Sequence, residues 1–152
     1  KEQLSQNIMI NEKKPYITFG SQMGDEFAAD VVQPHLIELR KLLNKYCNTV
    51  YSPEINEFAL VARVSGKIWY WDFEGCQKLR FNRKEKYLTI DIGIPENKWK
   101  DADSLSIRKY IFDNLQSGLL QIIKRLKKEK IQIDEECLLL DLEKVEKVFL
   151  NI

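Results

Sequence analysis

The 152-residue sequence has few of the residue types that most catalytic and metal sites need. Its one histidine, His35, follows a proline in a helix-forming stretch and has no evident partner for a catalytic role, so we expect a helix-surface or half-buried side chain. The three cysteines, Cys47, Cys76 and Cys137, are odd in number and far apart. This pattern favours reduced thiols in an intracellular protein over a disulfide framework or a zinc site.

Long apolar runs, phosphate-binding loops and a large charge excess are also missing. No apolar run approaches the length of a membrane span and no secretion signal is evident, so we predict a cytoplasmic protein without a membrane segment. Gly20 and Gly24 lack the following Lys-Ser/Thr pair of a phosphate-binding loop. The formal charge of +1 and the charged fraction of 31% indicate an ordinary surface rather than a globally basic nucleic-acid binder.

The sequence does contain a long alternation of apolar and polar residues, over residues 55–95. Such alternation is typical of strands that bury one face, and short turn-like segments such as Ser65-Gly66 interrupt it. The predicted strands are Ile55–Val64, Lys67–Phe73, Gln77–Arg83 and Tyr87–Ile94. Because short turns join consecutive strands, we predict an antiparallel meander.

The alternation also predicts which residues share a face of this sheet. The apolar face, expected in the core, carries Trp69, Trp71, Phe73, Leu79, Phe81, Leu88, Ile90 and Ile92. The polar face carries Tyr70, Asp72, Lys78, Arg80, Tyr87, Thr89 and Asp91. A one-residue slip would exchange the two sets, so the sequence specifies the register strongly.

Two segments have apolar residues at helical spacing. A proline is tolerated at the start of a helix but not inside it, so we predict a short turn followed by a helix from Pro34 to about Tyr46, with one kinked helix over 25–46 as the alternative. A long helix is predicted from Leu105 to about Glu129, with Asp103 or Ser104 as its N-cap.

The remaining segments complete the predicted fold. Tyr16–Phe19 is predicted to form a further strand, and Asp134–Leu150 fits either a helix or an extended segment. We therefore predict an α+β fold, an antiparallel β-meander of about four or five strands packed on one face by two main helices, plus a short C-terminal element. No repeat or linker divides the chain, so residues 1–152 are treated as one domain.

Paired carboxylates offer little support for catalysis. Asp72 and Glu74 share a strand face, but no further metal ligand is evident near them in the sequence. Glu135 and Glu136 are typical of solvated charge. We therefore predict no enzymatic activity, no catalytic residue, no cofactor and no metal.

A basic cluster raises the alternative of nucleic-acid binding. Residues 76–87 hold five basic residues and one acidic residue, Glu85, and Tyr70 and Tyr87 share their predicted face. However, Asp72 and Asp91 lie on the same predicted face and would repel a phosphate backbone. A mixed-charge face with aromatic residues is more typical of protein interfaces, so an RNA- or DNA-binding domain remains the alternative and a protein partner is favoured.

The run FEGCQKLRFNRKEKYLTIDIGIPENKW, residues 73–99, resembles the central segment of a family of bacterial polymorphic-toxin immunity proteins. The matching residues are Gly75, Leu79, Arg80, Arg83, Tyr87, Asp91-Ile92-Gly93-Ile94-Pro95 and Trp99. The resemblance implies a small cytoplasmic protein encoded beside a toxin, including toxins of contact-dependent growth inhibition. It also implies binding to a cognate toxin C-terminal domain, often a nuclease, whose active site or substrate-binding surface is occluded.

The resemblance and the polar sheet face together give a hypothesis for the binding site. The residues expected to contact the toxin are Tyr70, Asp72, Lys78, Arg80, Tyr87 and Asp91, with the acidic residues around 25–30 as a further contribution. Inhibitors of basic nuclease toxins are often strongly acidic, whereas this chain is nearly neutral. The activity of the toxin therefore stays open.

Overall fold

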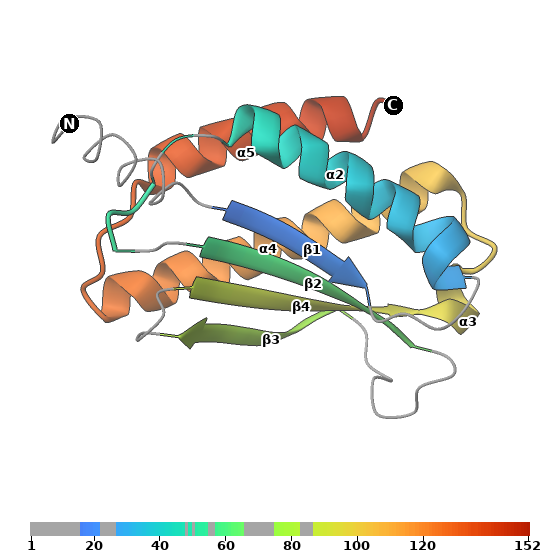
Figure 1. Ribbon diagram of the computed structural model, residues 1–152, viewed down its shortest axis with the longest axis horizontal. Helices are drawn as coiled ribbons and strands as arrows, with labels where there is room; N and C mark the ends of the chain where they lie inside the picture. Colours follow the sequence, from blue (N-terminus) through green and yellow to red (C-terminus); the bar gives the residue numbers. More distant parts are fainter. Residues whose placement is uncertain are drawn as a thin grey trace, which may run out of the picture.

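The computed structural model describes residues 16–21, 27–47, 49, 51–54, 57–65, 75–82 and 87–152. Its strands form one four-stranded sheet in the order β1-β2-β4-β3 (Figure 1). The strands are β1 (Tyr16–Ser21), β2 (Glu57–Ser65), β3 (Gly75–Asn82) and β4 (Tyr87–Pro95). The predicted strand Lys67–Phe73, with Trp69, Trp71 and Phe73, lies outside the described residues.

The sheet is mixed, so the predicted antiparallel meander is wrong. β2 pairs in parallel with both β1 and β4, and only β3 and β4 are antiparallel. Parallel strands require a crossover connection, and the chain between β1 and β2 includes a helix while the chain between β2 and β4 includes β3. The alternation of apolar residues predicts the faces of a strand but carries no information about which strand lies beside it or in which direction.

Helices hold more of the described residues than strands do. They are η1 (Phe27–Val32, a π-helix), α2 (Gln33–Tyr46), α3 (Glu96–Trp99), α4 (Ser104–Lys128) and α5 (Glu135–Phe149). Helical structure runs from η1 directly into α2, with Pro34 in the first turn of α2. The C-terminal element is a helix of 15 residues, so three main helices replace the predicted two.

The longest helix, α4, begins and ends as its sequence predicts. The Asp103 carboxylate accepts a hydrogen bond from the backbone nitrogen of Ser106 at 2.8 Å, which confirms Asp103 as the N-cap. Basic residues fill its last turn, where they complement the negative end of the helix dipole. The last helical residue is Lys128, Glu129 is the C-cap, and Lys130 then adopts a positive φ of 60°.

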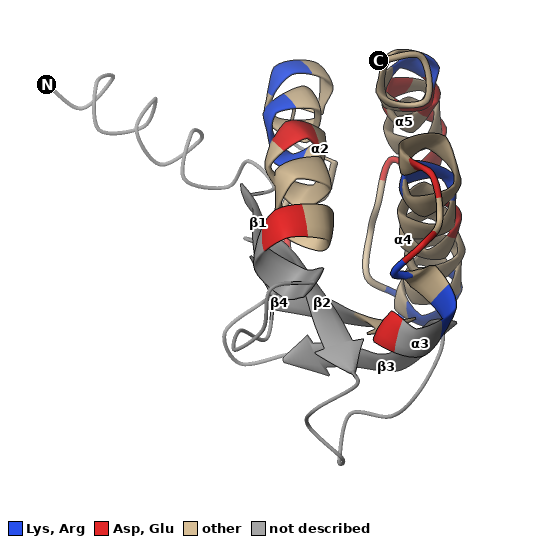
Figure 2. Ribbon diagram, turned by 90° about the vertical axis from the view of Figure 1, so that its right-hand side faces the viewer, with Lys and Arg blue, Asp and Glu red and all other residues tan. Residues whose placement is uncertain are grey.

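The core lies between the sheet and the helices. Figure 2 shows that α2, α4 and α5 stand on one side of the sheet. Ile92 and Ile94 of β4 are fully buried in a cluster with apolar side chains from these helices, which confirms the predicted core position of Ile92. Within the part of the chain that the structure describes, no helix has both the length and the apolar character to cross a membrane.

Candidate functional site

Four of the six predicted site residues lie on the antiparallel pair β3 and β4. The register sets Lys78 opposite Asp91, Arg80 opposite Thr89, and Asn82 opposite Tyr87. Lys78 and Asp91 thus occupy directly opposed positions, where unlike charges are favourable. Tyr70 and Asp72 lie outside the described residues, as do residues 25 and 26 of the acidic segment.

These positions belong to the face of the sheet that the helices leave uncovered. Strand residues alternate between the two faces, and the buried Ile92 and Ile94 occupy the helix-bearing face. Position 91, and position 78 opposite it, therefore belong to the other face. No described helix covers that face (Figure 2). A register shift between Cys76 and Lys78, which the alternation did not predict, precedes this pair.

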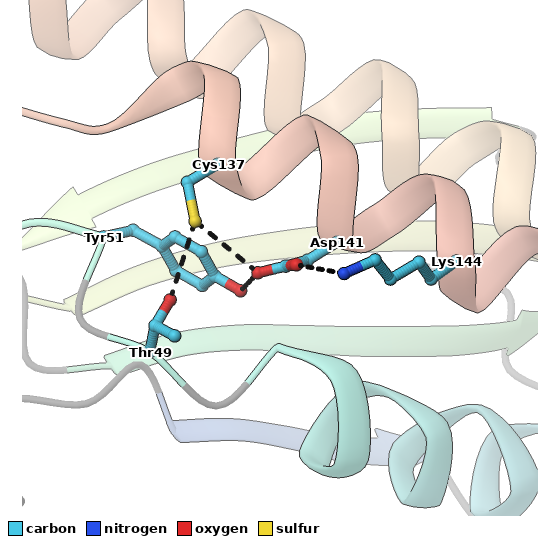
Figure 3. Close-up of polar contacts among 5 residues, drawn as sticks. All are labelled: Thr49, Tyr51, Cys137, Asp141 and Lys144. Carbon is cyan, nitrogen blue, oxygen red and sulfur yellow. Dashed lines mark hydrogen bonds and ion pairs between the residues drawn. The ribbon is translucent and has the colours of Figure 1, made fainter.

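A second polar cluster, which the sequence reasoning missed, joins the segment after α2 to α5 (Figure 3). We call it the Tyr51 cluster; it consists of Thr49, Tyr51, Cys137, Asp141 and Lys144. The Tyr51 hydroxyl donates to Asp141 Oδ2 at 2.6 Å, and the Cys137 thiol approaches the same oxygen at 3.8 Å. Lys144 Nζ lies 3.6 Å from Asp141 Oδ1, and Thr49 Oγ1 lies 3.9 Å from Cys137 Sγ. Tyr51 and Asp141 are only 2% and 8% exposed.

Backbone hydrogen bonds hold the two segments of this cluster together. The Asp134 carboxylate caps α5 by accepting from the Cys137 nitrogen at 3.1 Å. The Asp134 nitrogen in turn donates to the Tyr51 carbonyl oxygen at 2.7 Å, and the Gln132 nitrogen donates to Glu54 Oε2 at 3.0 Å. The segment that follows α2 is therefore fixed against the start of α5 at several points.

One feature of the sequence, an acidic residue within an apolar helical stripe, indicates a buried polar contact at this place. Asp141 lies within the apolar stripe of α5, one turn after Leu138 and one turn before Val145, both of which are buried. A carboxylate at a core position needs a buried partner because an unpaired buried charge is costly. The signal predicts that a partner exists, but it does not identify Tyr51, which is 90 residues away in the chain.

Two titratable groups, Tyr51 of this cluster and Cys47 beside it, hold their protons more firmly than usual. Burial raises the pKa of the Cys47 thiol to about 11. Burial, and then the hydrogen bond to Asp141, raises the pKa of Tyr51 above its ordinary value. Both groups are therefore protonated at neutral pH, and a protonated thiol is a weak nucleophile. The hydrogen bonds of the cluster join two segments of the chain that are distant in sequence.

His35 lies in α2 and is half-buried, in agreement with the prediction. Burial, and then the positive charge of Arg108, lowers its pKa, so the imidazole is neutral at pH 7. Among the described residues, no three or more His, Cys, Asp or Glu side chains come together in a group that could hold a metal ion.

The comparisons with known proteins identify the family. The family model described as Immunity protein 44 matches residues 16–147, from the first residue of β1 almost to the end of α5. The chain belongs to the Immunity protein 44 family. No curated protein and no solved structure matches it.

Membership of the Immunity protein 44 family confirms the resemblance to immunity proteins of polymorphic toxin systems. Such proteins neutralise a toxin, so the family supports a toxin-neutralising function and, in general terms, a toxin protein as partner. Immunity protein families are generally non-enzymatic. The match covers both the β3–β4 pair and the Tyr51 cluster.

Proposed function

We propose that this Immunity protein 44 member binds its cognate toxin domain and neutralises it by covering the toxin's active or substrate-binding surface. The observation that carries this proposal is the family match over residues 16–147, which includes the whole described sheet and nearly all of the helical layer. An inhibitor that only covers a surface needs a firm scaffold and a recognition face, and it needs no chemistry of its own.

For the recognition face we propose the side of the sheet that carries no described helix. Its described members are Lys78, Arg80, Tyr87 and Asp91, and we include Tyr70 and Asp72 from the sequence. Support comes from the helices, which stand together on the opposite side (Figure 2). The mixed charges also suit a specificity role, because a wrong partner would bury one of them without its counter-charge.

The finer features of the partner are part of the same proposal. The toxin domain is taken to be the C-terminal part of a larger protein of the contact-dependent growth inhibition type, with nuclease activity as one candidate for its chemistry. Neutralisation then takes place in the bacterial cytoplasm, where the substrate of such a toxin lies. Complex formation requires neither a cofactor nor a metal from this chain.

The experiment pairs this chain with the toxin domain encoded next to it. We expect co-expression to protect cells from the toxin, and the purified proteins to form a tight one-to-one complex. The Lys78→Asp/Asp91→Lys double variant exchanges two charges but retains an attractive cross-strand pair, so the sheet should still fold. On the proposed face it places like charges against the toxin. Because such contacts cost several kcal/mol, we expect an affinity loss of about 100-fold.

The single variants Lys78→Asp and Asp91→Lys serve as controls for the sheet itself, since each breaks the cross-strand pair. Circular dichroism and thermal unfolding monitor the folding of all three variants. A folded double variant that binds the toxin with wild-type affinity would exclude the sheet face as the interface. Failure of the wild-type protein to bind or protect would exclude the function.

A further inference from the structure

A surface hollow of about 510 Å³ lies along the last turns of α4. Its described wall consists of Gln121, Lys124, Arg125, Lys128 and Glu129. Their spacing of three and four residues places them on one stripe of the helix, and all are exposed except the half-buried Glu129. The opposite stripe of α4, with Ile122, Ile123 and Leu126, is buried in the core.

The positive charges in and beside this hollow differ in their partners. Arg125 Nε lies 3.5 Å from Glu129 Oε2, and Lys127, which precedes Lys128 in the sequence, forms an ion pair with Glu135. Lys124 and Lys128 have no carboxylate partner in the described part of the chain. They lie one helical turn apart, where like charges repel each other. The hollow therefore presents two uncompensated ammonium groups.

The helix dipole accounts for only part of this arrangement. Basic residues are favourable in the last turn of a helix, and Arg125, Lys127 and Lys128 occupy that turn of α4. Lys124 lies before it, where the dipole effect has fallen off. Its repulsion from Lys128 is therefore not offset by the dipole in the free protein, and an external anion would relieve it.

An exposed apolar side chain next to the hollow favours a protein as the source of that anion. Leu120 is 44% exposed and precedes Lys124 by one turn. An apolar side chain flanked by charges is typical of a protein interface, where apolar contact and charge pairing occur together. A nucleic-acid backbone would pair with the lysines but would gain little from Leu120.

The hollow also lies close to the proposed recognition face. Figure 1 shows that the carboxyl end of α4 lies at the end of the molecule where β3 ends at Asn82 and β4 begins at Tyr87. The same helix packs against both of these strands. A partner that covers the sheet face near Tyr87 can therefore extend around the β3 edge to reach α4.

We propose that Leu120, Lys124 and Lys128 form a second contact area for the toxin, which receives an acidic segment of the toxin surface. This inference rests on the proposed function and adds a partner chemistry to it: carboxylate side chains pair with the two ammonium groups while an apolar side chain packs on Leu120. Exposed charges of this kind act chiefly by steering the partner, so the association rate should depend on them.

The test compares two double variants of the full chain by association kinetics with the neighbouring toxin domain. Lys124→Glu/Lys128→Glu reverses the charge of the two lysines in the hollow. Lys41→Glu/Lys45→Glu reverses the charge of an equally spaced, exposed pair on α2. Both change the net charge by the same amount. At low ionic strength we expect the hollow variant to associate about tenfold more slowly than wild type, with the difference shrinking as salt is added, while the α2 variant changes much less.

The apolar part of the contact is tested separately. Leu120→Ala should accelerate dissociation of the complex, whereas Leu140→Ala, which truncates a comparably exposed leucine on α5, should leave it unchanged. Equal dissociation rates for these two variants would contradict the proposal.

Two further outcomes would overturn the inference while leaving the proposed function intact. Equal slowing by both charge-reversal variants would show that only the total charge matters. Binding of a single-stranded RNA oligonucleotide by the wild-type protein, lost in the hollow variant alone, would assign the hollow to nucleic acid. If the wild-type protein does not bind the toxin at all, the proposed function fails instead.

Discussion

The Tyr51 cluster permits a quantitative test of what holds the helical layer together. Tyr51→Phe removes one oxygen atom from a side chain that is 2% exposed and leaves its ring in place. The lost hydroxyl donates to Asp141 Oδ2 at 2.6 Å, within a site that also contains a weak thiol donor and one lysine. The variant therefore leaves a buried carboxylate with a depleted set of donors.

The expected cost follows from the charge of the acceptor. A hydrogen bond to a charged group contributes about 1.5–3 kcal/mol to stability, more than a neutral pair does. For a chain of this size the corresponding decrease in Tm is roughly 3–12 °C. Urea unfolding followed by circular dichroism measures the free energy, and an unchanged m-value would show that the unfolded state is unaffected.

Tyr46→Phe provides the matched control. Tyr46 ends α2, is half-buried, and its hydroxyl makes no hydrogen bond within the described residues, so its loss should change stability by less than about 0.5 kcal/mol. In a Tyr51→Phe/Asp141→Leu double variant both polar partners are gone, and destabilisation should be smaller than the sum of the single effects. Equal stability of Tyr51→Phe and Tyr46→Phe would refute the reasoning.

Two further predictions concern pH. Cys47, with a pKa of about 11 against an ordinary 9.0, and Tyr51 both hold their protons more firmly in the folded state, so their contribution is complete below about pH 9 and is lost as the pH rises. Cys47 contributes roughly 2–3 kcal/mol of this pH-dependent stability. The free energy of unfolding, measured in urea, should therefore decrease between pH 9 and 11, and the decrease should be smaller in Cys47→Ala. The pKa of His35, lowered by burial and by Arg108, should lie below 6.5 in an NMR titration and rise in Arg108→Gln. Because the folded state resists protonating His35, stability should also fall as the pH drops below about 6.5; a midpoint at or above 6.5 would contradict both causes.

Most of the local structure could be predicted from the sequence because its signals are local. The apolar stripe of α4 and its N-cap at Asp103 are set by residues within a few positions of each other. The secondary structure of the α5 segment is ambiguous in the sequence, because the residues from Cys137 to Leu142 fit both a helix and a strand. The structure gives a helix there, and the Asp134 cap is the local feature that marks its start.

The pairing of the strands could not be predicted because it depends on contacts between distant residues. Alternation indicated that positions 78 and 91 share a face, and the register adds that they are direct cross-strand partners. The parallel pairing of β2 with β4, by contrast, leaves no trace in either strand alone. The same holds for Tyr51 and Asp141, whose partnership joins segments 90 residues apart.

Under the proposed function, the local pattern of charges on this nearly neutral chain, rather than their total, discriminates among toxins. The net charge of +1 gives little long-range attraction, and at physiological ionic strength exposed charges are screened beyond about 8 Å. The 25-residue helix α4 is about 37 Å long, so charges at its two ends act independently. At the proposed second contact, Lys124 and Lys128 therefore steer only a toxin whose acidic segment has come within about this screening distance of them. The hydrogen bonds of the Tyr51 cluster fix the segment after α2 against α5, and a binding protein whose segments are fixed in advance pays a smaller entropic cost on association.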